Sequence, residues 1–335
     1  MWYVGCDIAD LTFDVTVISE PEQIETTLFN ISNSEPGFKM LVEHLTTCGI
    51  VAENALVVME CTGVYSERLS HYLYHQGFDV CVEPPQKVKK AFTDKRKTDP
   101  VDSRQVAEYG FRFRDKLHPW QPPDNVLDMI HQLLTLREQL IRARTSSKNA
   151  HHALLRKQHQ HARILAHHHH LIDFLAHGVQ DVEREIDTQL RTNPGLYEQT
   201  QNLTSMPCVG FLLAVSLAVI TQGFTQHVDA REIASFLGVC PWPYDSGTSV
   251  HRPASSDGAG PGRIRKLLYL SAMSLRTHHP AFRTYFERKV REGKPKQLVL
   301  NNIVNKLLHI LCAMMRSGKP YMKDYRSHNP RNAFL

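Results

Sequence analysis

The sequence predicts an α/β N-terminal domain with a mixed sheet, then a long helical coiled-coil hairpin, then a mainly α-helical C-terminal domain. Three observations predict this fold class. Short strand patterns alternate with helical patterns at the start of the chain, two long amphipathic segments follow, and the remainder consists of helical patterns separated by polar loops. A chain of 335 residues has room for two or three domains. We assign them to residues 1–120, 121–195 and 196–325, with a tail at 326–335.

The first strands are expected to be antiparallel. Residues 3–19 alternate apolar and polar positions on both sides of a polar turn, which predicts two strands joined tightly. Asp7 then emerges from the end of the first strand. Residues 24–31 form a third strand candidate, and the apolar spacing over 38–47 predicts a helix.

The next strands are expected to run parallel to the first. Residues 55–60, ALVVME, form a short and almost wholly apolar run, which is typical of a buried strand, and Glu60 ends it. A helix over 65–76 and a strand over 78–82 follow. Asp7 and Glu60 therefore stand at the carboxyl ends of strands, where open α/β sheets usually place their sites.

A helix begins near Pro100, at the end of a basic segment. Pro100 suits the first helical position, Asp99 suits the cap, and Asp102 falls in the first turn, where the helix dipole favours negative charge. The two carboxylates are three residues apart and project from one face. Two interpretations remain open and are compatible: a well-capped helix, or half of a metal site.

Together these acids could form a complete metal site. Four carboxylates from separated parts of the chain suit Mg²⁺ or Mn²⁺, and such a pair of metals promotes phosphoryl transfer. The alternative is that each acid has a local role, with Asp10 or Asp14 in place of Asp7. We predict the following metal ligands: Asp7, Glu60, Asp99 and Asp102.

The charge distribution permits a nucleic-acid partner. The net charge is only +5, but the cations are concentrated in segments. The residues expected to contact nucleic acid are Lys95, Arg96, Lys97, Arg104, Arg263, Arg265 and Lys266.

Several classes of protein are not indicated. The seven cysteines are scattered without C-x-x-C spacing, so we expect reduced, mostly buried thiols and no zinc site or disulfide framework. No apolar run reaches the roughly 18 residues of a membrane span, and the N-terminus lacks a signal pattern, so we expect a cytoplasmic protein. No G-x-S-x-G elbow supports an esterase.

Two long amphipathic helices are predicted over 126–158 and 164–190. With little else to pack against, they suggest an antiparallel hairpin or a coiled-coil dimer element. Nine histidines lie between 151 and 177. We do not favour a metal site there, because consecutive histidines on a helix point in different directions.

The C-terminal part combines helices with two polar loops. Residues 207–210, PCVG, resemble half of a helix-hairpin-helix, although a simple helix start is equally compatible. Prolines and glycine predict an irregular loop over 240–249, which carries Ser246 and Ser249. A basic helix opens at Arg263. A serine nucleophile with an arginine clamp, or an ordinary turn and basic helix, would both fit. Further helices are expected over 211–220, 281–292 and 297–315.

These motifs resemble the IS110 family of insertion-sequence transposases. The N-terminal motifs resemble its DEDD, RuvC-like domain, and the C-terminal motifs resemble its transposase domain. The segments that carry the resemblance are GCDIA at 5–9, ECTGVY at 60–65, KTDPVD at 97–102, MPCVG at 206–210, FLGV at 236–239, DSG at 245–247 and RKLLY at 265–269.

The resemblance implies a recombinase mechanism. The acidic quartet would be Asp7, Glu60, Asp99 and Asp102, binding Mg²⁺ or Mn²⁺, and Ser246 would attack DNA to form a phosphoserine link. It also implies donor and target DNA, a guiding bridge RNA, and a dimer or tetramer assembled through the helical hairpin. Action on the bacterial or archaeal nucleoid would follow. Related Piv-type invertases share these domains and flip a DNA segment.

The chain departs from the family pattern at two places. The family commonly has Pro-Gly-x-Gly where this chain has Pro-Cys-Val-Gly, and a lysine-glycine-asparagine loop where it has GAGP at 258–261. Ser249 is therefore the alternative nucleophile. Two other hypotheses remain: a RuvC-like junction nuclease with metal-bound water as nucleophile, and a nucleic-acid-binding protein with purely structural acids.

Overall fold

The computed structural model describes residues 1–61, 63–92, 99–225, 229–246, 250–256, 258 and 260–323. It describes the backbone but not the side chains of residues 99–101, 243–246 and 250–255. The chain divides into two compact units, residues 1–122 and 123–335. We describe each unit by itself.

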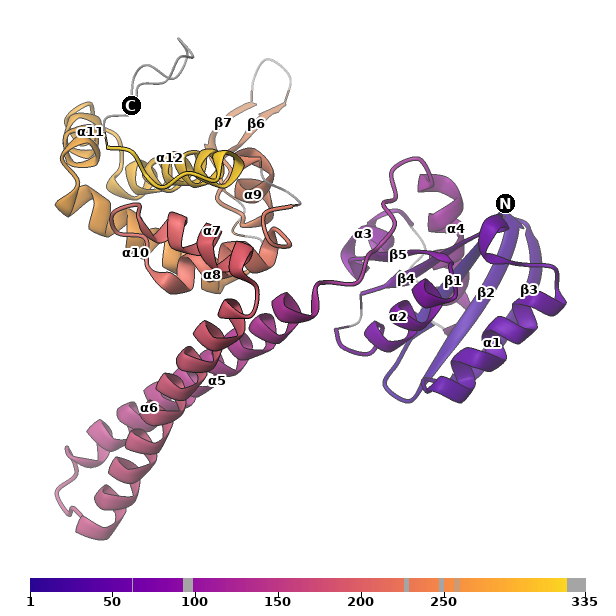
Figure 1. The fold of residues 1–335 in the computed structure, drawn as a ribbon, viewed down its shortest axis with the longest axis horizontal. Coiled ribbons are helices and arrows are strands. Elements are labelled where there is room, and N and C mark those ends of the chain that lie inside the picture. The colour runs from indigo at the N-terminus through magenta and orange to yellow at the C-terminus, as the bar shows by residue number, and fades with distance from the viewer. Residues whose placement is uncertain are drawn as a thin grey trace. The chain divides into compact units, whose positions relative to one another are not determined.

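The N-terminal unit is built on a mixed sheet (Figure 1). Within the described residues its strand order is β3-β2-β1-β4-β5; β1, β2 and β3 pair antiparallel, and β4 and β5 run parallel to β1. The predicted mixed sheet is confirmed. Its strands are β1 (Trp2–Ile8), β2 (Thr12–Glu20), β3 (Gln23–Ser32), β4 (Ala55–Glu60) and β5 (Asp79–Glu83).

Helices cover both faces of this sheet (Figure 1). Phe38, Leu41 and Leu69 belong to a core between one face and the first two helices, whereas Val106 and Ala107 of α4 pack on the other face. Sequence reasoning missed α3, which Pro85 opens at a position where the missing N–H costs nothing. The helices are α1 (Glu35–Thr47), α2 (Glu67–His75), α3 (Pro85–Lys90) and α4 (Asp99–Phe113), with a 3₁₀ turn at Ala52–Asn54.

The C-terminal unit begins with two long helices that lie side by side (Figure 1). These are α5 (Asn125–Leu154) and α6 (Ala162–Arg191). They confirm the predicted helical hairpin. Leu134 and Ile186 are buried between them and their neighbours, and Arg137 of α5 pairs with Glu183 of α6 at 2.6 Å.

The remaining helices surround a second core. Sequence reasoning missed α7, because Pro194 and Gly195 are typical of a break between helices. Asn193 instead caps this helix, since its side chain accepts from the Leu196 N–H. The helices are α7 (Pro194–Thr204), α8 (Phe211–Ile220), α9 (Ala230–Phe236), α10 (Gly262–His278), α11 (Pro280–Arg291) and α12 (Lys296–Ser317).

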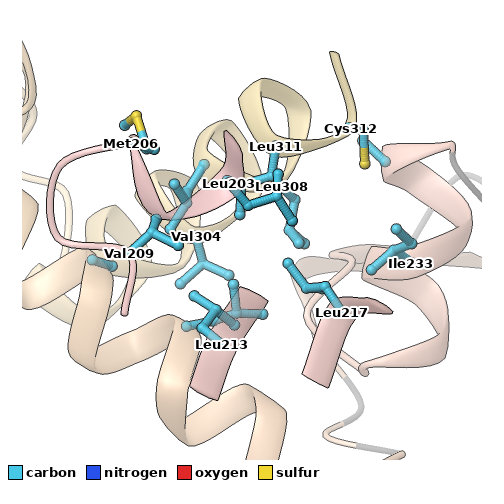
Figure 2. Packing of buried hydrophobic residues seen from close by; sticks show 14 of the residues in the cluster. Leu203, Met206, Val209, Leu213, Leu217, Ile233, Val304, Leu308, Leu311 and Cys312 are labelled. Atoms are coloured by element: carbon cyan, nitrogen blue, oxygen red, sulfur yellow. The ribbon is translucent and has the colours of Figure 1, made fainter. Parts of the chain in front are cut away.

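Helix α12 runs through the centre of this core (Figure 2). It is long and apolar enough to cross a membrane by length and composition alone. Val304, Leu308 and Leu311 instead pack against Leu217 of α8 and Ile233 of α9. Its apolar character is explained by this central position.

The predicted irregular loop over 240–249 was wrong in part. Strand β6 (Trp242–Ser246) pairs antiparallel with β7 (Val250–Ser255). Pro243 is compatible with this small ribbon, since a two-stranded sheet consists only of edge strands. Ser246 therefore belongs to a strand end and not to an unstructured loop.

All seven cysteines are described, and each is a free thiol without a disulfide bond. Cys6, Cys81 and Cys312 are buried, whereas Cys61 is exposed. The expectation of mostly buried thiols was therefore too broad.

Candidate functional site

Three parallel strands end in acids on the same face of the N-terminal sheet. Leu56 and Val58 of β4 belong to the core under α4, so alternation along the strand directs Glu60 to that face as well. Cys81 belongs to the same core, and Glu83 follows it by two residues on β5. Glu60 and Glu83 are partners in the strand register.

Helix α4 contacts β1 beside Asp7. A Cβ on Gly5 would collide with the backbone of Ser103 and Ala107, so this strand position admits only glycine at this distance. Asp7 lies two residues beyond Gly5 and therefore on the same face of the strand. The Ser103 hydroxyl is also 2.9 Å from the hydroxyl of Thr16, in a buried hydrogen bond.

The direction of α4 brings its first turn to the carboxyl end of the sheet. Ser103 lies over Gly5, whereas a Cβ on Gly110 would come within 2.8 Å of Val58 and 3.6 Å of Tyr3. The helix thus runs against β1, and Asp102 lies at the end of the sheet where Asp7 emerges. A sequence-distant acid and two strand-end acids are brought to one edge.

The predicted acids share an edge, but no preformed metal cluster is seen in the described residues. Asp7, Glu60 and Asp102 are all half-buried. Asp99 begins α4, and its side chain lies outside the described atoms. Among the residues described, no three His, Cys, Asp or Glu side chains lie close enough to hold a metal ion. The ligand set remains a prediction.

The acids make this edge of the sheet electronegative. Burial raises the pKa of the Cys6 thiol to about 12, and the charge of Asp7 adds to that shift. Burial followed by the charges of Glu83 and Asp79 raises the pKa of Cys81 to about 12. These cysteines are therefore protonated at neutral pH and do not act as thiolates.

Sequence reasoning missed Glu83. It ends an apolar strand just as Glu60 does, and that shared position was the available signal. Its carboxylate lies 3.0 Å from Lys87 Nζ and is almost fully covered, with 12% of the side chain exposed. After burial, its charge is the next cause that raises the pKa of Tyr109 on α4.

The predicted basic contacts near the acids are described only at Arg104. Its Nε lies 3.0 Å from Glu108, and its guanidinium also donates to the carbonyl of Pro21. Arg104 therefore braces α4 against the β2–β3 turn. Lys95, Arg96 and Lys97 lie outside the described residues.

Ser246 lies in the C-terminal unit, at the end of β6. Its backbone pairs with Val250, and Asp245 pairs with His251. The alternative nucleophile, Ser249, lies outside the described residues. The backbone of this serine is positioned by pairing with β7, although its side chain is not described.

The cations on α10 have different surroundings. Arg265 donates to the carbonyls of Leu237 (3.0 Å) and Gly260 (3.3 Å), which fastens the end of α9 to the loop before α10. Burial lowers the pKa of Arg263, which is half-buried. Lys266 is exposed. Of the three, Lys266 is the one most accessible to a phosphate.

The histidine-rich stretch forms no metal site in the described part of the chain. The His151 and His168 rings lie 6.5 Å apart across the hairpin, and His169 contacts Asp173 at 2.8 Å. These are pairwise contacts.

Comparisons with known proteins match both units. Residues 4–160 match the DEDD model of the IS110 transposases, described as "Transposase", and residues 200–287 match the model "Transposase IS116/IS110/IS902 family". The two matches occur in sequence order and together span most of the chain.

Individual relatives include DNA-inverting and insertion-element proteins. The pilin gene-inverting protein of Moraxella lacunata is 26% identical over 334 residues, covering 97% of this chain and 98% of the relative. The insertion element IS110 protein of Streptomyces coelicolor is 31% identical over 143 residues, 43% of this chain and 35% of the relative. The transposase for insertion sequence IS1328 of Yersinia enterocolitica is 23% identical over 232 residues, 62% of this chain and 66% of the relative.

Proposed function

Because the chain belongs to the IS116/IS110/IS902 family of transposases, we propose that it is a DNA recombinase that cuts and rejoins strands through the hydroxyl of Ser246. The observation that carries this proposal is the edge of the N-terminal sheet, where α4 brings Asp102 to the end of the strands that carry Asp7 and Glu60. Such an edge suits phosphoryl transfer because its carboxylates can bind a divalent cation.

The carboxylates fit a hard cation such as Mg²⁺ or Mn²⁺. Asp7, Glu60, Asp99 and Asp102 would hold it, since carboxylate oxygens are the ligands that these ions prefer. Asp7, Glu60 and Asp102 are each half-buried, so a bound cation would offset charges that water only partly solvates. A bound cation supplies positive charge that stabilises the phosphate and the leaving oxygen.

The serine step exchanges one phosphodiester bond for another. The Ser246 oxygen forms a bond to phosphorus, the bond from phosphorus to one deoxyribose oxygen breaks, and that oxygen takes up the proton that serine releases. The reverse attack, by a hydroxyl of another strand, restores a diester and frees serine. No nucleotide cofactor is consumed, because bond energy is stored in the protein–DNA ester.

The wider assembly is part of the same proposal. A bridge RNA would select donor and target DNA, the reaction would take place on the nucleoid in the cytoplasm, and the helical hairpin of α5 and α6 would join subunits into a dimer or tetramer. The exposed Leu171 and Phe174 on α6 support an assembly role, since they leave an apolar stripe uncovered by this chain.

The test is a strand-exchange assay on purified protein with its co-purifying RNA. We expect Ser246→Ala and Asp102→Asn each to abolish exchange, whereas Ser249→Ala retains it. Asp181→Asn, on the exposed surface of α6, is the matched control and should keep full activity. Full activity in either of the first two variants would contradict the proposal.

A suicide substrate separates the serine mechanism from a junction nuclease. On a denaturing gel, the serine mechanism yields a protein band shifted by covalent DNA, and Ser246→Ala removes it. A RuvC-like nuclease would cleave without any such band. Cleavage with no adduct in the wild type would favour the nuclease.

Inversion is the second candidate reaction. The pilin gene-inverting protein aligns along almost the whole chain, which favours it specifically. A plasmid carrying inverted sites reports inversion, and a pair of plasmids reports insertion. Products from the single plasmid alone would assign inversion, and products from the plasmid pair alone would assign insertion.

A further inference from the structure

One strongly basic segment of the C-terminal unit lies outside the predicted nucleic-acid contacts. Residues 276–306 contain eight Lys and Arg against two Glu, a net charge of +6, whereas the whole chain carries only +5. The rest of the chain is therefore close to neutral. The segment covers the end of α10, all of α11 and the first half of α12. None of these cations belongs to the predicted DNA contacts.

Several of these cations gather along the seam between α11 and α12. The ring of Tyr285 has the Arg288 guanidinium 5.8 Å and the Lys306 Nζ 4.9 Å from its centroid, one from each helix. The turn after α11 folds back through Gly293 (φ 83°), so that the N–H of Lys294 donates to the carbonyl of Lys289. We call the following five residues the basic strip: Arg288, Lys289, Lys294, Lys296 and Lys306.

One nearby acid neutralises the basic strip only in part. Glu292 pairs with Lys289 at 2.6 Å and lies 3.9 Å from Arg288. Among the described residues, no ion pair involves Lys294, Lys296 or Lys306. Burial lowers the pKa of Lys306, and the positive charges of Arg288 and Lys289 lower it further. A bound anion would relieve this repulsion.

The aromatic rings beneath the cations are not available for base stacking. Arg276 covers Phe286, with its guanidinium 5.1 Å from the ring centroid, and two cations cover Tyr285. Single-stranded nucleic acid is usually held by open aromatic platforms. A surface where cations cover the aromatic rings is instead suited to binding a phosphate backbone.

We propose that the basic strip binds the phosphate backbone of duplex DNA, as a contact surface separate from the acids and Ser246. The ten helical steps from Lys296 to Lys306 extend about 15 Å. That length corresponds to about four phosphates of one strand at 3.4 Å of rise each. This inference rests on the proposed recombinase function, which requires a DNA substrate to be held while strands are exchanged.

The test compares DNA binding by full-length variants. A triple variant, Arg288→Gln with Lys294→Gln and Lys296→Gln, removes three exposed cations from the basic strip. A matched triple variant, Lys39→Gln with Arg142→Gln and Arg184→Gln, removes three exposed cations elsewhere. The affinity of each variant for a fluorescent DNA duplex of random sequence is measured by anisotropy over a range of salt concentrations. A structured RNA serves as a second probe.

We expect the strip variant to lose about 2.7 from the slope of log affinity against log salt, since each phosphate contact contributes about 0.9. The matched variant should keep the wild-type slope. An unchanged slope on duplex DNA in the strip variant overturns the inference, whether or not RNA binding falls. DNA binding does not require cleavage, so the two proposals can fail separately. If the wild type shows no strand exchange but its DNA binding still depends on the basic strip, the recombinase function is contradicted and the binding surface is supported. Unchanged circular dichroism and Tm verify folding.

Discussion

Residue by residue, the backbone conformation of Cys208 explains a departure from the family pattern. Its φ is 65°, in the left-handed region that costs a side-chain-bearing residue roughly 1–2 kcal/mol. The family pattern places glycine here, and glycine adopts this conformation without that cost. The positive φ at this position accounts for the glycine that the family resemblance leads us to expect there.

We expect Cys208→Gly to raise stability by up to about 1 kcal/mol, because relief of the left-handed strain exceeds the added freedom of the unfolded chain. Cys208→Val should lower stability, since a β-branched side chain tolerates positive φ least. Thermal unfolding of both variants and the wild type measures the order of their stabilities. Equal stability of the glycine and valine variants would contradict it.

Gly5 controls the approach of α4 to the sheet. Gly5→Ala should destabilise the protein by about 1–3 kcal/mol, because its methyl group meets the backbone of Ser103 and Ala107 and α4 must shift. Strand exchange should fall as well, since Asp102 moves with the helix. Urea unfolding measures the first effect. Gly195→Ala serves as the control, because the nearest atom to its new Cβ would be 3.8 Å away.

At the scale of elements, sequence periodicity predicted the helices well and the ribbon poorly. Helices α8, α10, α11 and α12 carry apolar residues at helical spacing, and their positions agreed with the predictions within a few residues, whereas α3 and α7 were missed. Strands β6 and β7 carry no such pattern, and Pro241 and Pro243 indicated a loop. Each of these two strands is stabilised by pairing with the other, and a pattern within one segment does not predict such pairing.

The junction of α10 and α11 is tied to the segment that follows α12. His279 Nε2 is 3.2 Å from the Tyr321 hydroxyl, and the N–H of Tyr321 donates to Ser205. Nδ1 of His279 is buried, with no hydrogen-bond partner among the described residues. Burial lowers the pKa of His279, and the charge of Lys323 adds to this.

This histidine should make stability fall in mild acid. Its pKa is about 6.5 in the unfolded chain and lower in the fold, so the unfolded state binds a proton first as pH drops below 6.5. The free energy of unfolding should therefore decline from that pH until the folded group also titrates. His279→Asn places a residue suited to the N-cap position before α11 and removes the titration. Its stability curve should be shallower than that of the wild type below pH 6.5; parallel curves would contradict this.

For the whole molecule, each unit has its own hydrophobic core. The clusters around the sheet contain only residues of 1–122, and those around α8 and α12 contain only residues of the second unit. The strand ends with Asp7 and Glu60 were predictable because alternation and buried runs are local patterns. Glu83 could have been predicted in the same way, since it also ends an apolar strand. The close contact of Gly5 with α4 depends on tertiary packing, so the sequence did not reveal it.

Residues 1–122 should fold when produced alone. The fragment contains the complete sheet and the helices on both its faces, so it needs no apolar surface from the second unit. We expect a single cooperative unfolding transition with the circular dichroism of an α/β domain. A fragment without such a transition would show that the second unit is needed to complete its core.

The central place of α12 also has a consequence for synthesis in the cell. Helix α8, FLLAVSLAVI, packs its apolar surface partly against α12, which begins at Lys296 and ends at Ser317. At about 5–20 residues per second, the ribosome needs on the order of 5–20 s to make the chain between them. During that interval the side of α8 that carries Leu213, Ala214 and Leu217 lacks the part of its core that α12 supplies. The nascent C-terminal unit therefore presents an apolar segment to chaperones while the N-terminal unit is already able to fold.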